Sequence, residues 1–393
     1  MKKILGSSVV NSKMLIISNQ FSCIESSNIL HNNSISHQTF MNPYQPEKIR
    51  GMLLGMFIGD ALAMPVHWYY DTKALQQDYG PIRDMQAPKE FHPNSLLHLS
   101  NTGGHGRGQQ HGSIVGDVIL KGRKEFWAKP KLHYHHALRA GENTLNLQCL
   151  RILLRSSIPE YSVDGFLDAY VDFMTTADTH QDTYAESFHR DFFANWAKGK
   201  PAQECAGAED HNTASVGGLV LLPPVLVKSS GDWLTIRTQL RLTHRSPKLE
   251  HYAEPIMELL NQLLQQEHSE DIRDQALEAA KPLGVRLSKL LEETEHKNWQ
   301  DQHVIGPIFS PACYIEHSVP SVLFLLAKYQ HDAERALIAN AEVGGDNCHR
   351  GAVLGALLGA AGGTSVFPKR WIEQLHERTT ILEEIEHFIE SIH

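Results

Sequence analysis

Apolar residues recur at three- and four-residue intervals through most of the chain, whereas strictly alternating apolar and polar stretches are scarce. This spacing predicts helices in the ranges 51–70, 138–156, 163–197, 234–296 and 318–363. The segment SVGGLVLLPPVLVK is interpreted as a buried turn of chain that Pro223 and Pro224 bring to an end. Because no strand–helix–strand alternation is present, the sequence predicts an all-α fold with one compact multi-helix domain over residues 46–393.

Two of these segments carry a further pattern of small residues. Glycine or alanine occupies every fourth position at Gly51, Gly55, Gly59 and Ala63, and again at Gly351, Gly355, Gly359 and Gly363. Four-residue spacing places such residues on one face of a helix, although each glycine costs the helix roughly 1 kcal/mol relative to alanine. We therefore expect two helices to press these faces together, with residues 344–349 at the N-terminus of the second helix.

Residues 1–45 differ from the remainder of the chain. They are rich in serine and asparagine and contain one acidic residue, Glu25. This composition predicts a flexible arm. It partly resembles a mitochondrial presequence, although arginine is lacking. Three locations stay open: the cytoplasm, the mitochondrion, and the interior of a host cell that a secreted effector reaches.

Composition and charge exclude several classes of partner. The net charge of −9 argues against nucleic acid, since phosphate binding requires a basic surface. Five cysteines without paired spacing give no sign of a disulfide framework or of a cysteine-type zinc site. No segment reaches the roughly 18 uninterrupted apolar residues of a membrane span, so none is predicted. We expect a monomer.

Five segments, in this order, resemble the signature segments of the ADP-ribosylglycohydrolases. They are GMLLGMFIGDALAMPVHW, GENTLNLQ, SVGGLVLLPP, LTHRSP and the run from SVPSVLFLLAKY to GGDNCHRGAVLGALLGAAGG. The match extends from about residue 48 to residue 365. The resemblance implies an all-α, orthogonal multi-helix domain with a central cleft, which hydrolyses the bond between C1″ of ADP-ribose and an acceptor. It also implies two magnesium ions, held by two Asp-containing loops and an acidic residue after the first helix.

This sequence departs from the family pattern at each of those magnesium positions. His67 replaces the acid after the first helix, residues 141–144 replace the Thr-Asp-Asp-Thr run, and residues 346–349 replace the Asp-Thr-Asp-Thr run. Because Mg²⁺ requires several oxygen ligands and the remaining carboxylates are Glu142 and Asp346, the magnesium pair is predicted to be absent. One weakly held Mg²⁺ on these two carboxylates stays open. A zinc site, for which the spacing gives no independent support, stays open among His67, Asp346, Cys348 and His349.

The replacements introduce imidazole and amide groups, which favours altered chemistry over loss of function. The predicted metal-independent catalytic residues are Glu142, Asn143, Asp346, His349 and His67. The residues that the resemblance predicts to bind substrate are Gly141, Thr144, Gly217, Gly218, His244, Gly345, Asn347, Cys348 and Arg350. Helix capping is the alternative role for Asp346, Asn143 and Thr144, and Asp60 is interpreted as a brace for the first glycine helix.

Together these features predict a hydrolase that removes ADP-ribose from a modified protein side chain, with arginine as the favoured acceptor, and so reverses a paired ADP-ribosyltransferase. Carboxylates would stabilise the oxocarbenium-like transition state, and an imidazole would protonate the departing guanidine. The predicted partners are the ADP-ribosylated protein and ADP-ribose. Two alternatives are a non-catalytic protein that binds ADP-ribose and a hydrolase of a small ADP-ribose-like metabolite.

Overall fold

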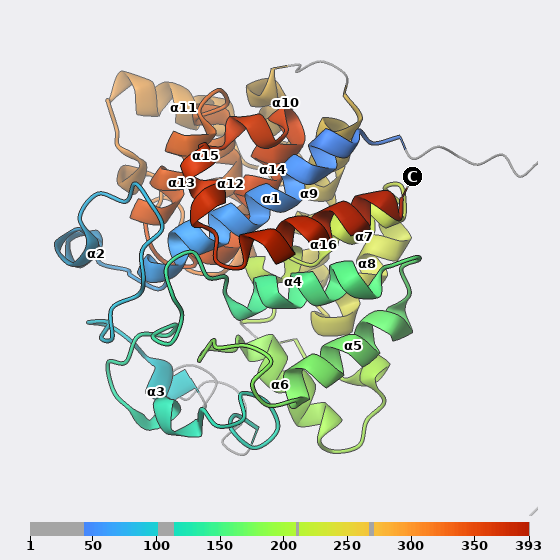
Figure 1. Cartoon of the computed structure of the whole chain (residues 1–393). Coiled ribbons are helices and arrows are strands. Elements are labelled where there is room, and N and C mark those ends of the chain that lie inside the picture. Colours follow the sequence, from blue (N-terminus) through green and yellow to red (C-terminus); the bar gives the residue numbers. More distant parts are fainter. Residues whose placement is uncertain (1–42, 101–113, 210–211, 267–270, 393) are drawn as a thin grey trace, which may run out of the picture. The chain divides into compact units, whose positions relative to one another are not determined.

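The computed structural model describes residues 43–100, 114–209, 212–266 and 271–392. The regular secondary structure of these residues is helical (Figure 1). The predicted all-α fold is confirmed. The predicted arm, residues 1–45, lies almost entirely outside the described residues. The helices are α1 (Pro46–Ala63), α2 (Thr72–Tyr79), α3 (Leu97–Ser100), α4 (Leu145–Ser156), α5 (Val163–Thr175), α6 (Ser187–Trp196), α7 (Leu222–Lys228), α8 (Trp233–Thr243), α9 (Pro247–Gln265), α10 (Ile272–Ala280), α11 (Leu287–His296), α12 (Ile315–Lys328), α13 (Ala333–Glu342), α14 (Asn347–Gly362), α15 (Lys369–Gln374) and α16 (Arg378–Glu390).

The two glycine-patterned helices, α1 and α14, form the most extensive helix pair of the described chain. A Cβ atom at Gly55 would overlap the carbonyl oxygen of Gly355, and one at Gly359 would overlap that of Gly51. The backbones are therefore in direct contact, as the spacing predicted. Because the start of α1 faces the end of α14, the two helices are antiparallel. The end of α1 and the start of α14 are thus neighbours, and this arrangement positions the site.

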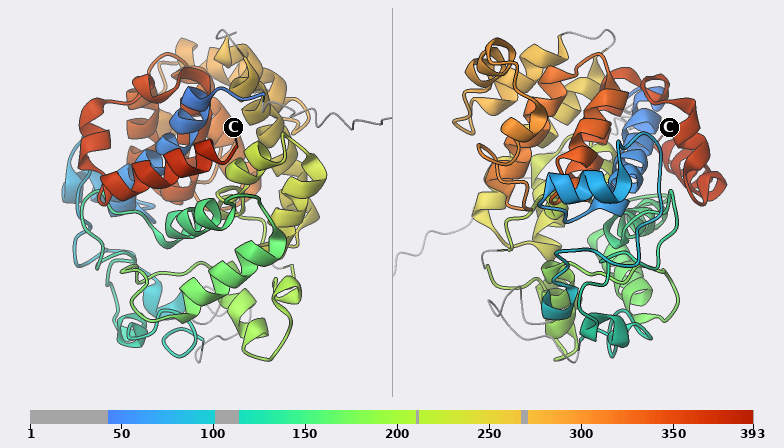
Figure 2. Two further views of the ribbon diagram at one scale, coloured as in Figure 1. Left: turned by 45° about the vertical axis from the view of Figure 1, so that its right-hand side comes forward. Right: turned by 90° about the vertical axis from the view of Figure 1, so that its left-hand side faces the viewer.

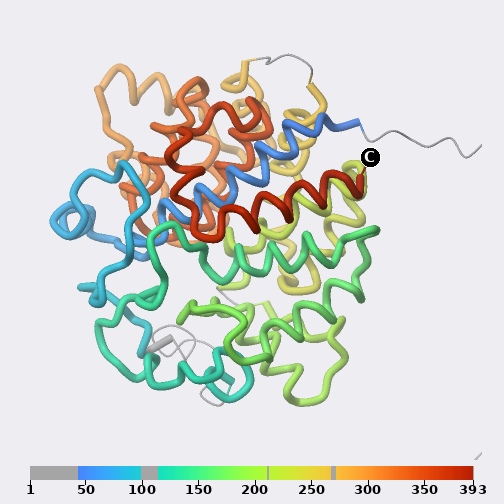
Figure 3. Tube along the Cα trace, in the orientation of Figure 1, coloured from blue at the N-terminus to red at the C-terminus, as the bar shows by residue number. Residues whose placement is uncertain are grey.

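Helices distant in sequence enclose this central pair. Figures 1 and 3 show α16, in red, running beside α1, in blue, so the first and last described helices lie next to each other. Helix α4 packs on α16, and α5 packs on α4, which continues the arrangement away from the pair (Figure 2). Nearly every residue of α1 and α14 is buried, and this explains why neither helix has a polar face.

The interpretation of residues 215–228 as a turn ended by two prolines is wrong. Val216–Leu219 forms a 3₁₀ turn, and α7 starts at Leu222, so that Pro223 and Pro224 occupy its first turn. The first N–H groups of a helix have no intrahelical acceptor, and proline there removes no hydrogen bond. The two prolines therefore begin a helix.

One helical stretch of the described residues, Pro46–Val66, has the length and apolar composition of a membrane span. It contains α1, and 94% of its most apolar window is buried inside the protein. A core helix has the same composition, and the packing of α1 on α14 accounts for this one. Over the residues that the structure describes, the finding agrees with the prediction of no membrane span.

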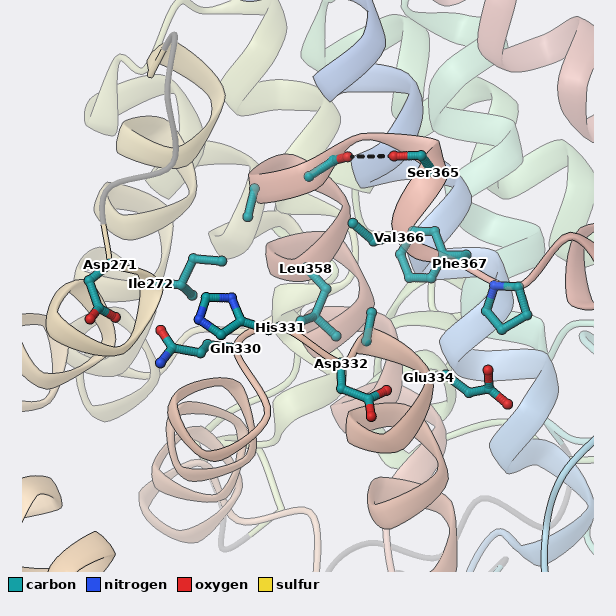
Figure 4. A pocket seen from close by; sticks show the side chains of 14 residues that line it. Asp271, Ile272, Gln330, His331, Asp332, Glu334, Leu358, Ser365, Val366 and Phe367 are labelled. Atoms are coloured by element: carbon teal, nitrogen blue, oxygen red, sulfur yellow. Dashed lines mark hydrogen bonds between the residues drawn. The ribbon is translucent and has the colours of Figure 1, made fainter.

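A hollow of about 760 Å³ lies at the C-terminal end of α14, lined by residues 330–334 and 365–368 among others (Figure 4). Two acidic side chains at its edge, Asp271 and Asp332, accept hydrogen bonds from the first turns of α10 and α13. These carboxylates therefore cap helices. The hollow is at the opposite end of α14 from the predicted site.

Candidate active site

The loop between α13 and α14 is bonded to the segment that follows α1. The N–H of Trp68 donates to the carbonyl oxygen of Gly345 at 2.8 Å, and the N–H of Gly345 donates to that of Tyr69 at 2.7 Å. Gly344 and Gly345 have φ angles of 66° and 69°, which side chains other than glycine rarely adopt. The loop thereby places Asp346 next to the histidine that precedes Trp68.

Asp346 lies at the centre of a buried cluster of polar side chains. Its Oδ1 is 3.2 Å from Nε2 of His67 and 2.7 Å from Nδ1 of His349. All three side chains are at most 2% exposed. Asp346 stands at the N-cap position of α14, yet its side chain accepts no capping hydrogen bond from the backbone N–H groups of that helix. The carboxylate thus serves the two imidazoles and does not cap the helix.

A second carboxylate, that of Glu186, approaches the same nitrogen of His349. Its Oε1 is 3.6 Å from Nδ1 of His349, and its Oε2 accepts a hydrogen bond of 2.7 Å from Asn146 in the first turn of α4. Glu186 occupies the N-cap position of α6 without capping it. Three helix N-termini, those of α4, α6 and α14, therefore meet at the cluster, and their partial positive charge favours carboxylates there.

A chain of hydrogen bonds continues from His67 into the protein. Nδ1 of His67 is 2.7 Å from Nε2 of His135, and Nδ1 of His135 is 2.7 Å from Oδ1 of Asp182. The other oxygen of Asp182 accepts from the backbone N–H of Leu145 at 2.8 Å. Asp182 and His135 thus fix the orientation of the His67 ring.

Burial and mutual attraction set the charges of the cluster. Burial alone would lower the pKa of His349, but Asp346 and Glu186 raise it to about 10. Burial lowers the pKa of His67 to about 3, against the opposing effect of Asp346. Burial would raise the pKa of Asp346, but His349 and His67 hold it below its ordinary value. For Glu186 burial prevails, and its pKa is raised. At neutral pH the cluster therefore holds a cationic His349, a neutral His67 and an ionised Asp346.

Asp60 acts as a brace between α1 and the start of α4. Its carboxylate accepts hydrogen bonds from Nδ2 of Asn143 at 2.9 Å, and from the N–H and hydroxyl of Thr144 at 2.8 and 2.7 Å. Burial raises the pKa of Asp60, and these hydrogen bonds oppose the shift. The donors of Asn143 and Thr144 are thus engaged in holding the fold together.

Replacing Asp60 with alanine is expected to lower the free energy of unfolding by about 2–5 kcal/mol, because the buried N–H and hydroxyl of Thr144 would lose their acceptor and Asn143 would keep only the carbonyl oxygen of Phe57. Asp60→Asn keeps one side-chain acceptor and should cost less. Urea unfolding followed by circular dichroism measures both losses. Equal stability of the Asp60→Ala variant and the unaltered chain would contradict the bracing role.

No hydrogen bond or ion pair of the described residues joins Glu142 to the cluster. Its Oε2 accepts from the backbone N–H of Arg139 at 2.9 Å, its side chain is partly exposed, and burial raises its pKa. The carbonyl oxygen of Gly141 accepts from the N–H of His376 at 2.9 Å. Residues 141 and 142 form a turn against the segment after α15, and the predicted catalytic role of Glu142 stays a prediction.

Two side chains predicted to bind substrate, Arg350 and Asn347, instead hold the loop before α14. Nε of Arg350 donates to Oδ1 of Asn340, and a terminal nitrogen donates to the carbonyl oxygen of Gly344, both at 2.8 Å. Nδ2 of Asn347 donates to the carbonyl oxygen of Ala341 at 3.0 Å. Both side chains are fully buried, so their contacts are with the protein itself.

Three further residues predicted to bind substrate do lie beside the cluster. A Cβ atom at Gly217 would overlap Oε2 of Glu186, and one at Gly218 would crowd the ring of His244. Nε2 of His244 is buried and has no hydrogen-bond partner among the described residues. The sulfur of Cys348 lies within 4.8 Å of ring nitrogens of His67 and of a second histidine. The structure thus gathers Gly217, His244 and Cys348 near the cluster.

Sequence reasoning missed Asp182 and Glu186, and it interpreted the cluster of His133, His135 and His136 as structural or as lining the rim of the cleft. Asp182 and Glu186 have no fixed spacing relative to residues 346–349 and belong to none of the signature segments. The available signal is the density of acids and histidines in THQDTYAESFHRD, residues 179–191. Such a run is usually interpreted as a solvated surface, and only the fold shows that two of its acids are buried.

The carboxylates of Asp346 and Glu186 thus approach one imidazole at helix N-termini of an all-α domain. The family model of the ADP-ribosylglycohydrolases matches residues 41–393, and the chain belongs to this family. A solved structure described as an "ADP-ribosylglycohydrolase-related protein complex" is 18% identical, with a TM-score of 0.59 over 88% of this chain and 99% of that chain. A search of curated proteins finds no match. Family membership supports hydrolysis of an ADP-ribose linkage in an ADP-ribosylated substrate.

The residues present do not fit the two magnesium ions that the family implies. The donors of Asn143 and Thr144 are bonded to Asp60, and the atoms nearest to Oδ1 of Asp346 include two imidazole nitrogens. Magnesium requires near-octahedral oxygen coordination, and imidazole suits other metals better. No step of the reaction is therefore assigned to magnesium.

Proposed function

We propose that this chain hydrolyses the N-glycosidic bond between C1″ of ADP-ribose and an arginine side chain of a modified protein, and so reverses a paired ADP-ribosyltransferase. The observation that carries the proposal is the convergence of Asp346, Glu186 and a cationic His349 beside the signature loops of the family. Cleavage of such a bond passes through an oxocarbenium-like state, which nearby carboxylates stabilise.

The three side chains have complementary roles in this reaction. Glu186, whose pKa burial raises, accepts a proton from the attacking water, whose oxygen bonds to C1″. The imidazolium of His349 gives its proton to the departing guanidine nitrogen. Asp346 stays ionised, holds His349 and faces the positive charge of the sugar ring. Neutral His67 fixes the Asp346 carboxylate from the other side.

Aromatic rings link the buried cluster to the surface. The rings of Trp68 and His67 are stacked with centroids 4.6 Å apart, and the ring of Trp68 lies 6.2 Å from that of Tyr70. Tyr70 is 50% exposed. Flat apolar faces of this kind bind an adenine ring or an arginine guanidinium, so Trp68 and Tyr70 are the proposed contacts for the substrate.

The test is to incubate the full chain with protein ADP-ribosylated on arginine, and with a serine-linked substrate as the comparison, and to measure free ADP-ribose by mass spectrometry. We expect release from the arginine substrate, at a rate that does not rise when Mg²⁺ is added to metal-free buffer. Tight binding without release would instead identify a non-catalytic ADP-ribose-binding protein. Release from a small ADP-ribose-like metabolite alone would identify a metabolite hydrolase.

A further inference from the structure

A divalent transition ion fits at the point where three side chains of the cluster meet. We propose that the chain binds one Zn²⁺-class ion through Nε2 of His67, a carboxylate oxygen of Asp346 and Nδ1 of His349, with one position open for water. One ligand atom from each of the three residues lies within 4.8 Å of the others, and all three side chains are buried. Two imidazoles, one carboxylate and an open position are a ligand set typical of zinc and non-haem iron sites.

The two distances from Oδ1 of Asp346 to the imidazole nitrogens are close to those around such an ion. With metal–ligand bonds of about 2.0–2.1 Å, neighbouring ligands on a tetrahedral ion lie about 3.3 Å apart. Nε2 of His67 is 3.2 Å from Oδ1 of Asp346. Nδ1 of His349 is 2.7 Å from the same oxygen, so that pair has to open by about half an ångström to reach the same spacing. A small rotation of the His349 ring provides this opening.

The hydrogen bonds around the cluster hold the ligand atom of His67 in place. An ionised Asp182 only accepts, so Nδ1 of His135 donates to it. Nε2 of His135 lies 2.7 Å from Nδ1 of His67, and Nε2 of His67 lies 3.2 Å from Oδ1 of Asp346. The ring nitrogen of His67 that would bind the ion is therefore directed at the carboxylate that would bind it too.

One buried carboxylate oxygen at this point, Oδ2 of Asp346, lacks a hydrogen-bond partner among the described residues. A buried carboxylate oxygen without a donor costs free energy, and a bound ion removes this cost. The hydrogen bond from His67 through His135 to Asp182 supplies the outer partner that histidine ligands of metal sites usually have.

A second ligand set overlaps the first and has to be distinguished from it. His67, His135 and Cys348 also offer three ligand atoms within 4.8 Å of one another. In that set Nδ1 of His67 and Nε2 of His135 are already bonded to each other, and neither nitrogen is left without a partner. The first set is therefore the proposed site, and Cys348 provides a matched control.

The proposed ion shares the site of the proposed hydrolysis, but its binding does not depend on that function. On Nδ1 of His349 the ion replaces the proton that the hydrolysis uses, and one proton is released on binding. The ion-loaded and the hydrolysing states are therefore alternatives. Because binding is measured without substrate, a failure of one proposal is distinguishable from a failure of the other.

The experiment treats the full chain with a chelator, removes the chelator and titrates Co²⁺ and Zn²⁺. Visible d–d absorption reports Co²⁺ coordination, and calorimetry reports the stoichiometry and affinity for Zn²⁺. We expect one ion per chain, tetrahedral Co²⁺ bands without a thiolate charge-transfer band, and a melting temperature that rises with Zn²⁺. Mg²⁺ at the same concentration should produce none of these changes.

The variants assign the ligands. Asp182→Asn removes an outer partner of a ligand, and it should weaken Zn²⁺ binding by roughly 10- to 100-fold. Asp346→Asn and His349→Asn each remove a ligand, and each should weaken Zn²⁺ binding by more than that. Cys348→Ser should bind Zn²⁺ as the unaltered chain does. Circular dichroism establishes that each variant is folded. A thiolate band that Cys348→Ser abolishes, unchanged binding in folded Asp346→Asn, or no binding by the unaltered chain would each overturn the proposal.

Discussion

Asp346→Asn and Glu186→Gln each lower the rate of ADP-ribose release by at least about a hundredfold, as expected for loss of a group that stabilises charge or transfers a proton in the transition state. Both substitutions keep the size of the side chain, so the helices that start at these positions should remain in place. The rate is measured as free ADP-ribose from the arginine-linked substrate. Thermal melting of each variant establishes that the loss does not come from unfolding.

Two further substitutions in the same series make the result specific. Asp117→Asn removes a carboxylate whose side chain is 51% exposed and paired with Lys124, and should retain the full rate. Glu142→Gln tests the residue chosen from sequence, and we expect a smaller loss than for Glu186→Gln, because Glu142 bonds to the backbone of Arg139. Full activity of both Asp346→Asn and Glu186→Gln would show that the reaction takes place elsewhere.

Gly355→Leu is expected to destabilise the fold by about 3–5 kcal/mol and to lower the melting temperature by roughly 5–10 °C. At this position even a Cβ atom would overlap the carbonyl oxygen of Gly55, which belongs to a helix backbone and has little freedom to move. The two helices would have to separate, and the buried contacts along both would be lost. Differential scanning calorimetry measures the shift.

Ala361→Leu is the matched control on the same helix. Ala361 is partly exposed and lines the hollow of about 760 Å³, so a larger side chain has room there (Figure 4). We expect a change in melting temperature well below that of Gly355→Leu. Equal shifts in the two variants would mean that any enlargement of α14 is harmful and that close backbone contact is not the cause.

Much of the helical framework could be predicted from local pattern. The four-residue glycine spacing implied a backbone contact between two helices, and α1 and α14 make that contact. The prolines at 223 and 224 show the limit of this approach, because proline both ends helices and begins them. Whether a helix ends or begins at a proline depends on whether the residues after it can pack as a helix against the rest of the protein.

The sequence by itself determined the fold class and the placing of Asp346 at the start of a glycine-patterned helix, because these depend on spacing within single segments. It also determined the family, which depends on the order of five segments along the chain. Only the tertiary structure decided which side chains accompany Asp346. Glu186, His135 and Asp182 reach the cluster because separate helix starts and loops converge there, and no local pattern encodes such convergence. Arg350 shows the same limit, since a charged residue in a signature loop turned out to be a buried support for the loop. The charges followed from the structure for the same reason: burial lowers the pKa of His67, and two neighbouring carboxylates raise that of His349.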